Sequence, residues 1–330
     1  MRVRYPVLAP LVLTIALAAC SSPEPAPPGE AAPEEATPTM PTPEAEATSL
    51  LGQPLVSPPP TAERLAAMEG EQAAAKADYD RNPDDADAII WLGRRTAYLG
   101  RYNAAIDIFS EGIAKHPEDA RMYRHRGHRY LTTRQIDQAI ADFERAASLV
   151  EGQPDEVEPD GQPNARNIPT STLQSNIWYH LGLGRYVKGD FAGALDAYRR
   201  CMDVSKNPDM QVATAYWLYM TLRRLGQDAE AAAVLEPITA DLDVIENASY
   251  HRLLMLFKGE ETPESILGAE EEALGQATTA YGIGNWHYIN GRQDEGMAVF
   301  RRIVNENPTQ WAAFGYLAAE AELARAGAQP

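Results

Sequence analysis

Small and aromatic residues recur along the chain at a fixed interval of 34 positions. The interval separates four matching pairs, which are Gly93 and Gly127, Ala105 and Ala139, Phe109 and Phe143, and Pro83 and Pro117. Paired helices need small residues where they approach closely, aromatic residues to fill the space between units, and a proline that ends the second helix. Unrelated amphipathic helices would not share one offset across four residue types. The pattern therefore predicts a stack of helix pairs.

The spacing resembles that of the tetratricopeptide repeat family, whose pattern is W-x2-L-G-x2-Y, then A-x3-F, then P. Two full repeats carry it at Leu92, Gly93, Gly100, Tyr102, Ala105, Phe109 and Pro117, and at Tyr123, Gly127, Tyr130, Ala139, Phe143 and Ala146. A third repeat follows an insertion, and a weaker one lies near the C-terminus, at Trp178, Gly182, Ala194 and Tyr198, and at Gly284, Gly291, Phe300 and Pro308. The match is poor around residues 212–237. The resemblance covers most of residues 62–326 and implies an all-α solenoid of antiparallel helix pairs, wound into a right-handed superhelix.

The remaining segments complete a solenoid domain over residues 61–330. Residues 62–81 are predicted to form a helix that completes a partial first repeat, residues 242–275 a divergent helix pair, and residues 311–325 a terminal capping helix. Cys201 falls where the second helix of a repeat needs a small residue, so we expect its thiol to be packed and unreactive.

The N-terminus has the features of a secretion signal. Arg2 and Arg4 precede an apolar run over residues 7–19, which is shorter than the ~20 apolar residues that cross a bilayer. The run ends in LAAC, which resembles the lipobox of bacterial lipoproteins. The resemblance implies that residues 1–19 are a signal peptide and that Cys20 becomes a lipidated N-terminus. An ordinary cleaved signal with an incidental cysteine is the alternative.

Residues 20–60 are predicted to be a flexible tether. Residues 21–60 hold twelve prolines and no Lys or Arg, and such a segment buries too little apolar surface to offset its ordering entropy. Ser21, rather than Asp, follows the lipidated position, which is compatible with transfer to the outer membrane of a Gram-negative bacterium. We therefore expect a chain anchored by lipid in the bacterial cell envelope, at the outer membrane and facing the periplasm.

The charge of the chain argues against binding to nucleic acid and against lying flat on an anionic lipid surface. The formal net charge is −18, and without residues 1–19 the chain has 27 basic and 47 acidic residues, a net charge of −20. Nucleic acid binding requires positive contacts with phosphates, and anionic lipid surfaces attract polybasic segments. After lipidation of Cys20, only Cys201 remains, so the sequence predicts no internal disulfide.

Residues 121–130, RMYRHRGHRY, form a basic stretch within this acidic chain. In tetratricopeptide arrays the first helix of each pair lines a concave groove, and its second, fifth, ninth and twelfth residues point into that groove. On this basis the predicted partner-binding groove contains Arg94, Arg121, Arg124, His128, Asn176, Tyr179 and Tyr186. Arginine forks match carboxylates and tyrosine gives contact area at low entropic cost, which favours an acidic or carboxylate-ended ligand. Arg126 and Arg129 are expected to make ordinary surface or inter-repeat contacts.

Structural alternatives exist for each of these features. The arginines of the groove could pair with neighbouring acids such as Glu118, Asp119 and Asp137. His125 and His128 are spaced to share a metal, but no third ligand stands at a motif spacing, so no metal is expected. The acidic insert at residues 151–172 is either a lid over the groove or a tolerated surface loop.

The second half also resembles the NlpI-type envelope lipoproteins, at residues 217–219, at residues 257–267 and over residues 280–300. That group joins a lipidated N-terminus to tetratricopeptide repeats and acts as a scaffold for periplasmic cell-wall hydrolases and their protease; the long tether and the insert depart from it. We expect a non-enzymatic adaptor that binds a protein or peptide partner and needs no cofactor. Binding of an anionic small molecule or glycan is the alternative. An enzyme is a third possibility, disfavoured because no nucleophile elbow, HExxH or phosphate loop appears.

Overall fold

The computed structural model describes residues 44–267 and 273–327. The predicted signal peptide, the lipidation at Cys20 and the tether up to residue 43 lie outside the described residues. The described helices are α1 (Ala62–Arg81), α2 (Ala86–Tyr98), α3 (Tyr102–Lys115), α4 (Ala120–Thr132), α5 (Ile136–Val150), α6 (Leu173–Lys188), α7 (Phe191–Val204), α8 (Pro208–Arg224), α9 (Asp228–Leu235), α10 (Ala248–Lys258), α11 (Pro263–Leu267), α12 (Ala273–Ile289), α13 (Gln293–Glu306) and α14 (Phe314–Arg325). A short hairpin, β1 (Ala47–Thr48) and β2 (Pro54–Leu55), precedes them, and a 3-10 turn, η1 (Pro308–Gln310), precedes α14.

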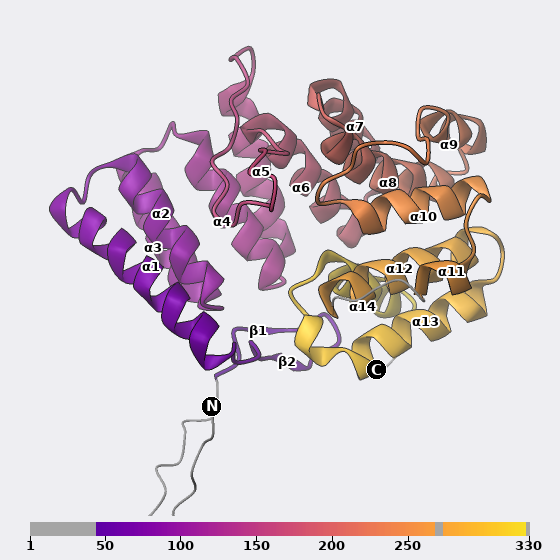
Figure 1. Cartoon of the computed structure of the whole chain (residues 1–330), viewed down its shortest axis with the longest axis horizontal. Helices are drawn as coiled ribbons and strands as arrows, with labels where there is room; N and C mark the ends of the chain where they lie inside the picture. Colours follow the sequence, from indigo (N-terminus) through magenta and orange to yellow (C-terminus); the bar gives the residue numbers. More distant parts are fainter. Residues whose placement is uncertain (1–43, 268–272, 328–330) are drawn as a thin grey trace, which may run out of the picture. The chain divides into compact units, whose positions relative to one another are not determined.

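The helices pack as the 34-residue period predicts. Consecutive helices lie side by side from α1 to α9 (Figure 1). In four pairs, a glycine of the first helix faces the ring of an aromatic residue of the second, and an added Cβ atom would lie 2.5 to 3.0 Å from that ring. The four contacts are Gly93 with Phe109, Gly127 with Phe143, Gly182 with Tyr198, and Gly284 with Phe300. The prediction of an all-α solenoid of tetratricopeptide-type helix pairs is confirmed.

The pair formed by α8 and α9 departs from this pattern. Tyr219 stands where the other pairs have the glycine, and α9 has only eight residues. The ring of Tyr219 instead stacks on Phe257 of α10, with ring centroids 4.7 Å apart. The poor sequence match over residues 212–237 therefore corresponds to a real change in how this pair packs.

Cys201 occupies the expected small-residue position of α7. Its side chain is fully buried, and its Sγ atom lies 3.2 Å from the hydroxyl of Thr214. Burial raises the pKa of the Cys201 thiol to about 11, so the reactive thiolate is scarce at neutral pH.

The C-terminal helix α14 does more than cap the end of the solenoid. It packs against α12 and α13, and also against α6 of the third repeat. A capping helix keeps a polar outer face, but residues Gly315 to Leu323 are all buried. The helix thus lies between early and late repeats.

One buried ion pair fixes α14 to the second repeat. Nε of Arg134, in the turn after α4, lies 2.9 Å from Oε2 of Glu320 in α14. The other two guanidinium nitrogens donate to the carbonyl oxygens of Thr132 and Trp311, each at 2.7 Å. Both charged side chains are almost inaccessible to solvent. The contact joins residues 186 positions apart in the chain.

The C-terminal part of the predicted tether is folded. The tether was expected to extend to residue 60, but β1 and β2 pair and belong to the folded body. Leu55 is buried in the core, the indole of Trp311 donates to the Val56 carbonyl at 2.8 Å, and the Asn103 amide donates to the Glu46 carbonyl at 2.7 Å. The reason is a short apolar run, SLLGQPLV at residues 49–56, whose signal is lost when composition is averaged over forty proline-rich positions.

Replacement of Glu320 by Gln should strongly destabilise the protein. The substitution keeps the shape of the side chain but leaves Arg134 buried without its counter-charge, and breaking a buried pair in this way costs about 3–5 kcal/mol. The free energy of unfolding, measured by urea titration, checks this. The control is Glu306→Gln, which removes an exposed carboxylate paired with Arg302 and should cost less than about 1 kcal/mol. Equal losses in the two variants would contradict the role given to α14.

Candidate functional site

The first helices of three successive repeats, α2, α4 and α6, present the polar side chains of the predicted groove. Side-chain caps fix where each helix begins: Asp85 accepts from the Ala88 amide, Asp119 from the Arg121 amide, and Thr172 from the Ser175 amide. At α6 the bond is reciprocated, because the Ser175 hydroxyl accepts from the Thr172 amide at 2.9 Å. We call the surface formed by Arg94, Arg124, His128, Asn176 and Tyr179 the groove face.

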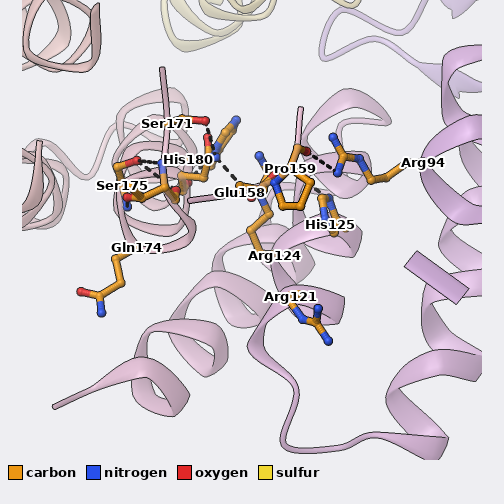
Figure 2. Close-up of polar contacts among 12 residues, drawn as sticks. Arg94, Arg121, Arg124, His125, Glu158, Pro159, Ser171, Gln174, Ser175 and His180 are labelled. Carbon is orange, nitrogen blue, oxygen red and sulfur yellow. Dashed lines mark hydrogen bonds and ion pairs between the residues drawn. The ribbon is translucent and has the colours of Figure 1, made fainter. Parts of the chain in front are cut away.

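The insert, residues 151–172, lies on the groove face. Arg124 Nε is 2.8 Å from Glu158 Oε2, and the Asn176 amide donates to the same oxygen at 3.2 Å (Figure 2). Arg94 Nη1 donates to the Pro159 carbonyl at 2.7 Å. The side chains of Arg124 and Glu158 are only 9% and 11% exposed. The groove face therefore already holds an extended acidic segment of its own chain.

Backbone contacts at both ends keep the insert in this position. Val157 and Thr172 form an antiparallel bridge, and the Leu173 amide donates to the Glu156 carbonyl at 2.9 Å. In the middle of the insert, Arg95 Nη1 donates to the Gly161 carbonyl at 2.9 Å. A Cβ atom at Gly161 would clash with the Tyr98 hydroxyl and lie 3.0 Å from Arg94 Nη2, so a larger residue there would displace these two side chains.

Helix α14 covers the part of the groove face that the insert leaves open. The ring of Phe314 lies 5.5 Å from His180, 5.6 Å from His128 and 6.3 Å from Tyr179, measured between centroids. Tyr186 lies deeper, is fully buried, and accepts a hydrogen bond from the Tyr281 hydroxyl at 3.0 Å. In this structure Tyr186 is part of the core, because α12 and α14 pack over a position that an open superhelix would expose.

Arg121 differs from the other predicted arginines. Its guanidinium contacts Asp119 at 2.6 Å and Asp87 at 2.7 Å. These two carboxylates raise the pKa of Arg121. Figure 2 shows its side chain lying apart from Glu158. For this residue the structure has the internal pairing that the sequence left open as an alternative.

The other two arginines of the basic stretch contact the preceding repeat, as expected, and Arg126 donates there to the Ser110 hydroxyl of α3 at 3.1 Å. Arg126 makes a bidentate contact with the buried Asp142 of α5, at 2.8 Å for both nitrogens. Arg129 makes the expected inter-repeat contact, since its guanidinium lies over the ring of Tyr102 in α3. It also lines a cavity together with Arg94 of α2 and with Arg124. Arg129 stands 34 positions after Arg95, which contacts the insert. The repeat period therefore could have predicted that Arg129 lies on the side of α4 that faces the insert.

The histidines of the site are held neutral. His125, His128 and His180 are packed among arginines and rings, and desolvation lowers the pKa of each, that of His180 to about 3. The repulsion of nearby cations, with Arg124 among them in each case, lowers all three further. His125 Nδ1 faces Arg124 Nη1 at 3.1 Å, so it accepts a hydrogen bond and is not free to bind a metal.

No protein-family model matches this chain, and no curated protein matches it. Among solved structures it is similar to YrrB, described as a TPR protein with an unusual peptide-binding site, at 14% identity over 76% of this chain and 97% of that one, with a TM-score of 0.41. It is also similar to the Cut9–Hcn1 hetero-tetramer of the APC/C, at 14% identity over 77% of this chain and 48% of that one, with a TM-score of 0.31. A third similarity is to the TPR domain of P58(IPK), at 15% identity over 79% and 96% of the two chains, with a TM-score of 0.23.

The folded protein should lose stability as the pH falls below neutrality. The folded-state pKa of His180, about 3, lies below the ordinary value of 6.5, so the unfolded chain binds more protons at acidic pH. Stability is therefore lost as the pH falls through 6.5 toward 3, and His180 alone should account for about 2 kcal/mol between pH 7.5 and pH 5. Urea titrations at the two pH values check this.

The His180→Asn variant should show a smaller difference between the two pH values than the wild-type chain. His251, which bonds the Thr239 carbonyl at the protein surface, supplies the control variant His251→Asn. The assignment would be wrong if both variants kept the full difference.

Proposed function

We propose that this chain is a lipid-anchored adaptor of the bacterial cell envelope that binds an acidic or extended segment of a partner protein on the groove face. One observation carries the proposal: Arg94, Arg124 and Asn176 already hold an extended segment of the chain through a carboxylate and a backbone carbonyl. A peptide with the same chemistry would compete with the insert for these donors.

The contacts that hold the insert are ones that a partner peptide could make in its place. Glu158 is held by one ion pair and one amide, while Pro159 and Gly161 are held through carbonyl oxygens that any peptide possesses. A partner with an acidic side chain beside an extended backbone can therefore satisfy the same donors. The second set of predicted residues, His128 and Tyr179, is covered by Phe314 and would contact a partner only after α14 moves.

The location in the envelope rests on the N-terminal sequence. The apolar run before Cys20, the lipobox and Ser21 support lipidation and transfer to the outer membrane, with the solenoid in the periplasm. The resemblance to NlpI-type lipoproteins supports a scaffolding role there. No helix in residues 44–267 or 273–327 is long and apolar enough to cross a bilayer.

We infer a binding role rather than a catalytic one from the state of the groove-face side chains. The arginines are positively charged at neutral pH, and the neighbouring histidines are neutral and pack against other rings. These groups recognise charge and shape, and they need no cofactor to do so.

Binding of a peptide in trans tests the groove face. The probe is a labelled synthetic peptide with the sequence DEVEPDGQP, which is that of residues 155–163. The Glu158→Gln variant weakens the hold on the insert by the loss of one charged hydrogen bond, about 1.5–3 kcal/mol, so it should bind the peptide at least tenfold more tightly than the wild-type chain. Fluorescence anisotropy measures the difference.

Two controls make this test specific. Glu156→Gln removes an exposed carboxylate from the same insert and should leave peptide affinity at the wild-type level. A peptide in which Gln replaces the acid that corresponds to Glu158 should bind the Glu158→Gln variant at least tenfold more weakly. Equal binding of both peptides would refute the carboxylate recognition on which the proposal depends.

The anchor is tested separately. A Cys20→Ser chain should not be lipidated and should leave the membrane fraction, because several acyl chains on one cysteine are what makes the anchoring stable. Fractionation of cells that express the two chains, followed by mass spectrometry of the N-terminus, gives the result. Unchanged membrane association of the Cys20→Ser chain would rule out the lipid anchor.

A further inference from the structure

A small internal cavity lies between α2, α4 and the insert. Its volume is about 120 Å³, and its polar lining consists of Arg94, Tyr98, Arg124, His125, His128, Arg129 and Glu158. It is distinct from the outer surface on which Arg121 meets Asp87 and Asp119. Three guanidinium groups from two helices converge on it.

The charges that line the cavity do not balance. Three arginines face one carboxylate, Glu158, and both histidines are neutral, so the lining carries a net charge of +2. Two acids of the neighbouring helices are engaged elsewhere, since Glu71 of α1 pairs with Arg95, and Asp87 of α2 pairs with Arg121. Uncompensated charge in a poorly solvated space is unfavourable unless a counter-ion enters.

The guanidinium of Arg129 is the group of the cavity lining that most clearly lacks an anionic partner among the described residues. Within the part of the chain that the structure describes, it has no hydrogen bond or ion pair, and only its contact with the ring of Tyr102 is present, at 5.6 Å. Burial, and after it the neighbouring Arg124 and Arg94, lower the pKa of Arg129 to about 10, and no carboxylate acts against them. This half-buried guanidinium lines the cavity, and its N–H donors can take an anion as their partner there.

We infer that this cavity binds a small tetrahedral oxyanion with about two negative charges, of the size of phosphate or sulfate. The volume of about 120 Å³ is several times the roughly 30 Å³ that one water occupies in the liquid, so a compact ion larger than a single water fits. Four oxygens around a centre can accept from Arg129 and from N–H groups of Arg94 and Arg124 that the contacts with Pro159, Tyr98, Glu158 and His125 leave over. A dianion would neutralise the lining, and the inference does not depend on the proposed peptide binding.

The probe is inorganic phosphate, titrated into the purified full chain from which oxyanions have been dialysed. Sodium chloride keeps the ionic strength constant, and calorimetry and the melting temperature are followed together. The expected result is saturable binding of one phosphate per chain, with a rise in melting temperature that sodium chloride alone does not produce. Sulfate should act like phosphate, and acetate should bind at least tenfold more weakly. The absence of saturable binding below about 10 mM phosphate in the wild-type chain overturns the inference.

Substitution of Arg129 locates the site. Arg129→Met keeps the apolar stem and removes the guanidinium, so phosphate affinity should fall at least tenfold. Because this change also removes an uncompensated charge, the melting temperature without phosphate should be no lower than that of the wild type. Arg145→Met, an exposed arginine of α5, removes the same charge away from the cavity and should leave phosphate affinity unchanged. If Arg129→Met does not fold, Arg129→Gln serves in its place.

The outcomes separate this inference from the proposed function. Phosphate affinity that is equal in the Arg129 and Arg145 variants overturns the site, whatever the peptide titrations show. Equal affinity for acetate and phosphate overturns the assignment to a tetrahedral dianion and makes the cavity a carboxylate site. Saturable phosphate binding that needs Arg129 supports the inference even if the peptide DEVEPDGQP never binds.

Discussion

The buried ion pair between Arg134 and Glu320 is the contact on which the rest of the structure depends. In an open solenoid each repeat touches only its neighbours, so distant repeats are independent. Here the pair ties the second repeat to the last helix, and α14 then covers His128, Tyr179 and Tyr186. The backbone of Arg134 is strained at this contact. Its φ of 65° is a left-handed conformation that costs a non-glycine residue roughly 1–2 kcal/mol. At the equivalent position one repeat earlier, Gly100 adopts a φ of 77°.

In the closed arrangement, most arginines of the basic stretch pair with acids of the same chain. An arginine-rich face on an acidic protein is expected to attract acids, and the nearest acids belong to the same chain. Asp87 and Asp119 satisfy Arg121, Asp142 satisfies Arg126, and Glu158 satisfies Arg124. Arg129 alone among the arginines of this stretch lacks a carboxylate within the described residues. The interior between α2, α4 and the insert is therefore where positive charge remains in excess.

The sequence predicted the contacts within and between neighbouring repeats, because the period records them directly. Gly93 beneath Phe109 and Arg124 on the inner face follow from spacing alone. The period says nothing about contacts across the superhelix, so neither the position of Phe314 nor the burial of Tyr186 could be predicted. Leu55 was missed because its short apolar run stands among prolines. Arg134, in contrast, could have been noticed as an arginine at the turn position that Gly100 occupies in the preceding repeat, and such departures from a repeat pattern point to long-range contacts.

The hairpin at residues 47–55 determines how mechanical load would enter the folded body. The chain reaches the solenoid through two-residue strands, with the Val56 carbonyl bonded to Trp311 and Glu46 bonded to Asn103. A pull on the N-terminal side would therefore act first on the contact of Glu46 with Asn103 in α3, then on the hairpin, and then through Val56 on Trp311 just before α14. Tension applied there is directed at the helix that closes the groove face, and α1, the first helix in the sequence, is bypassed.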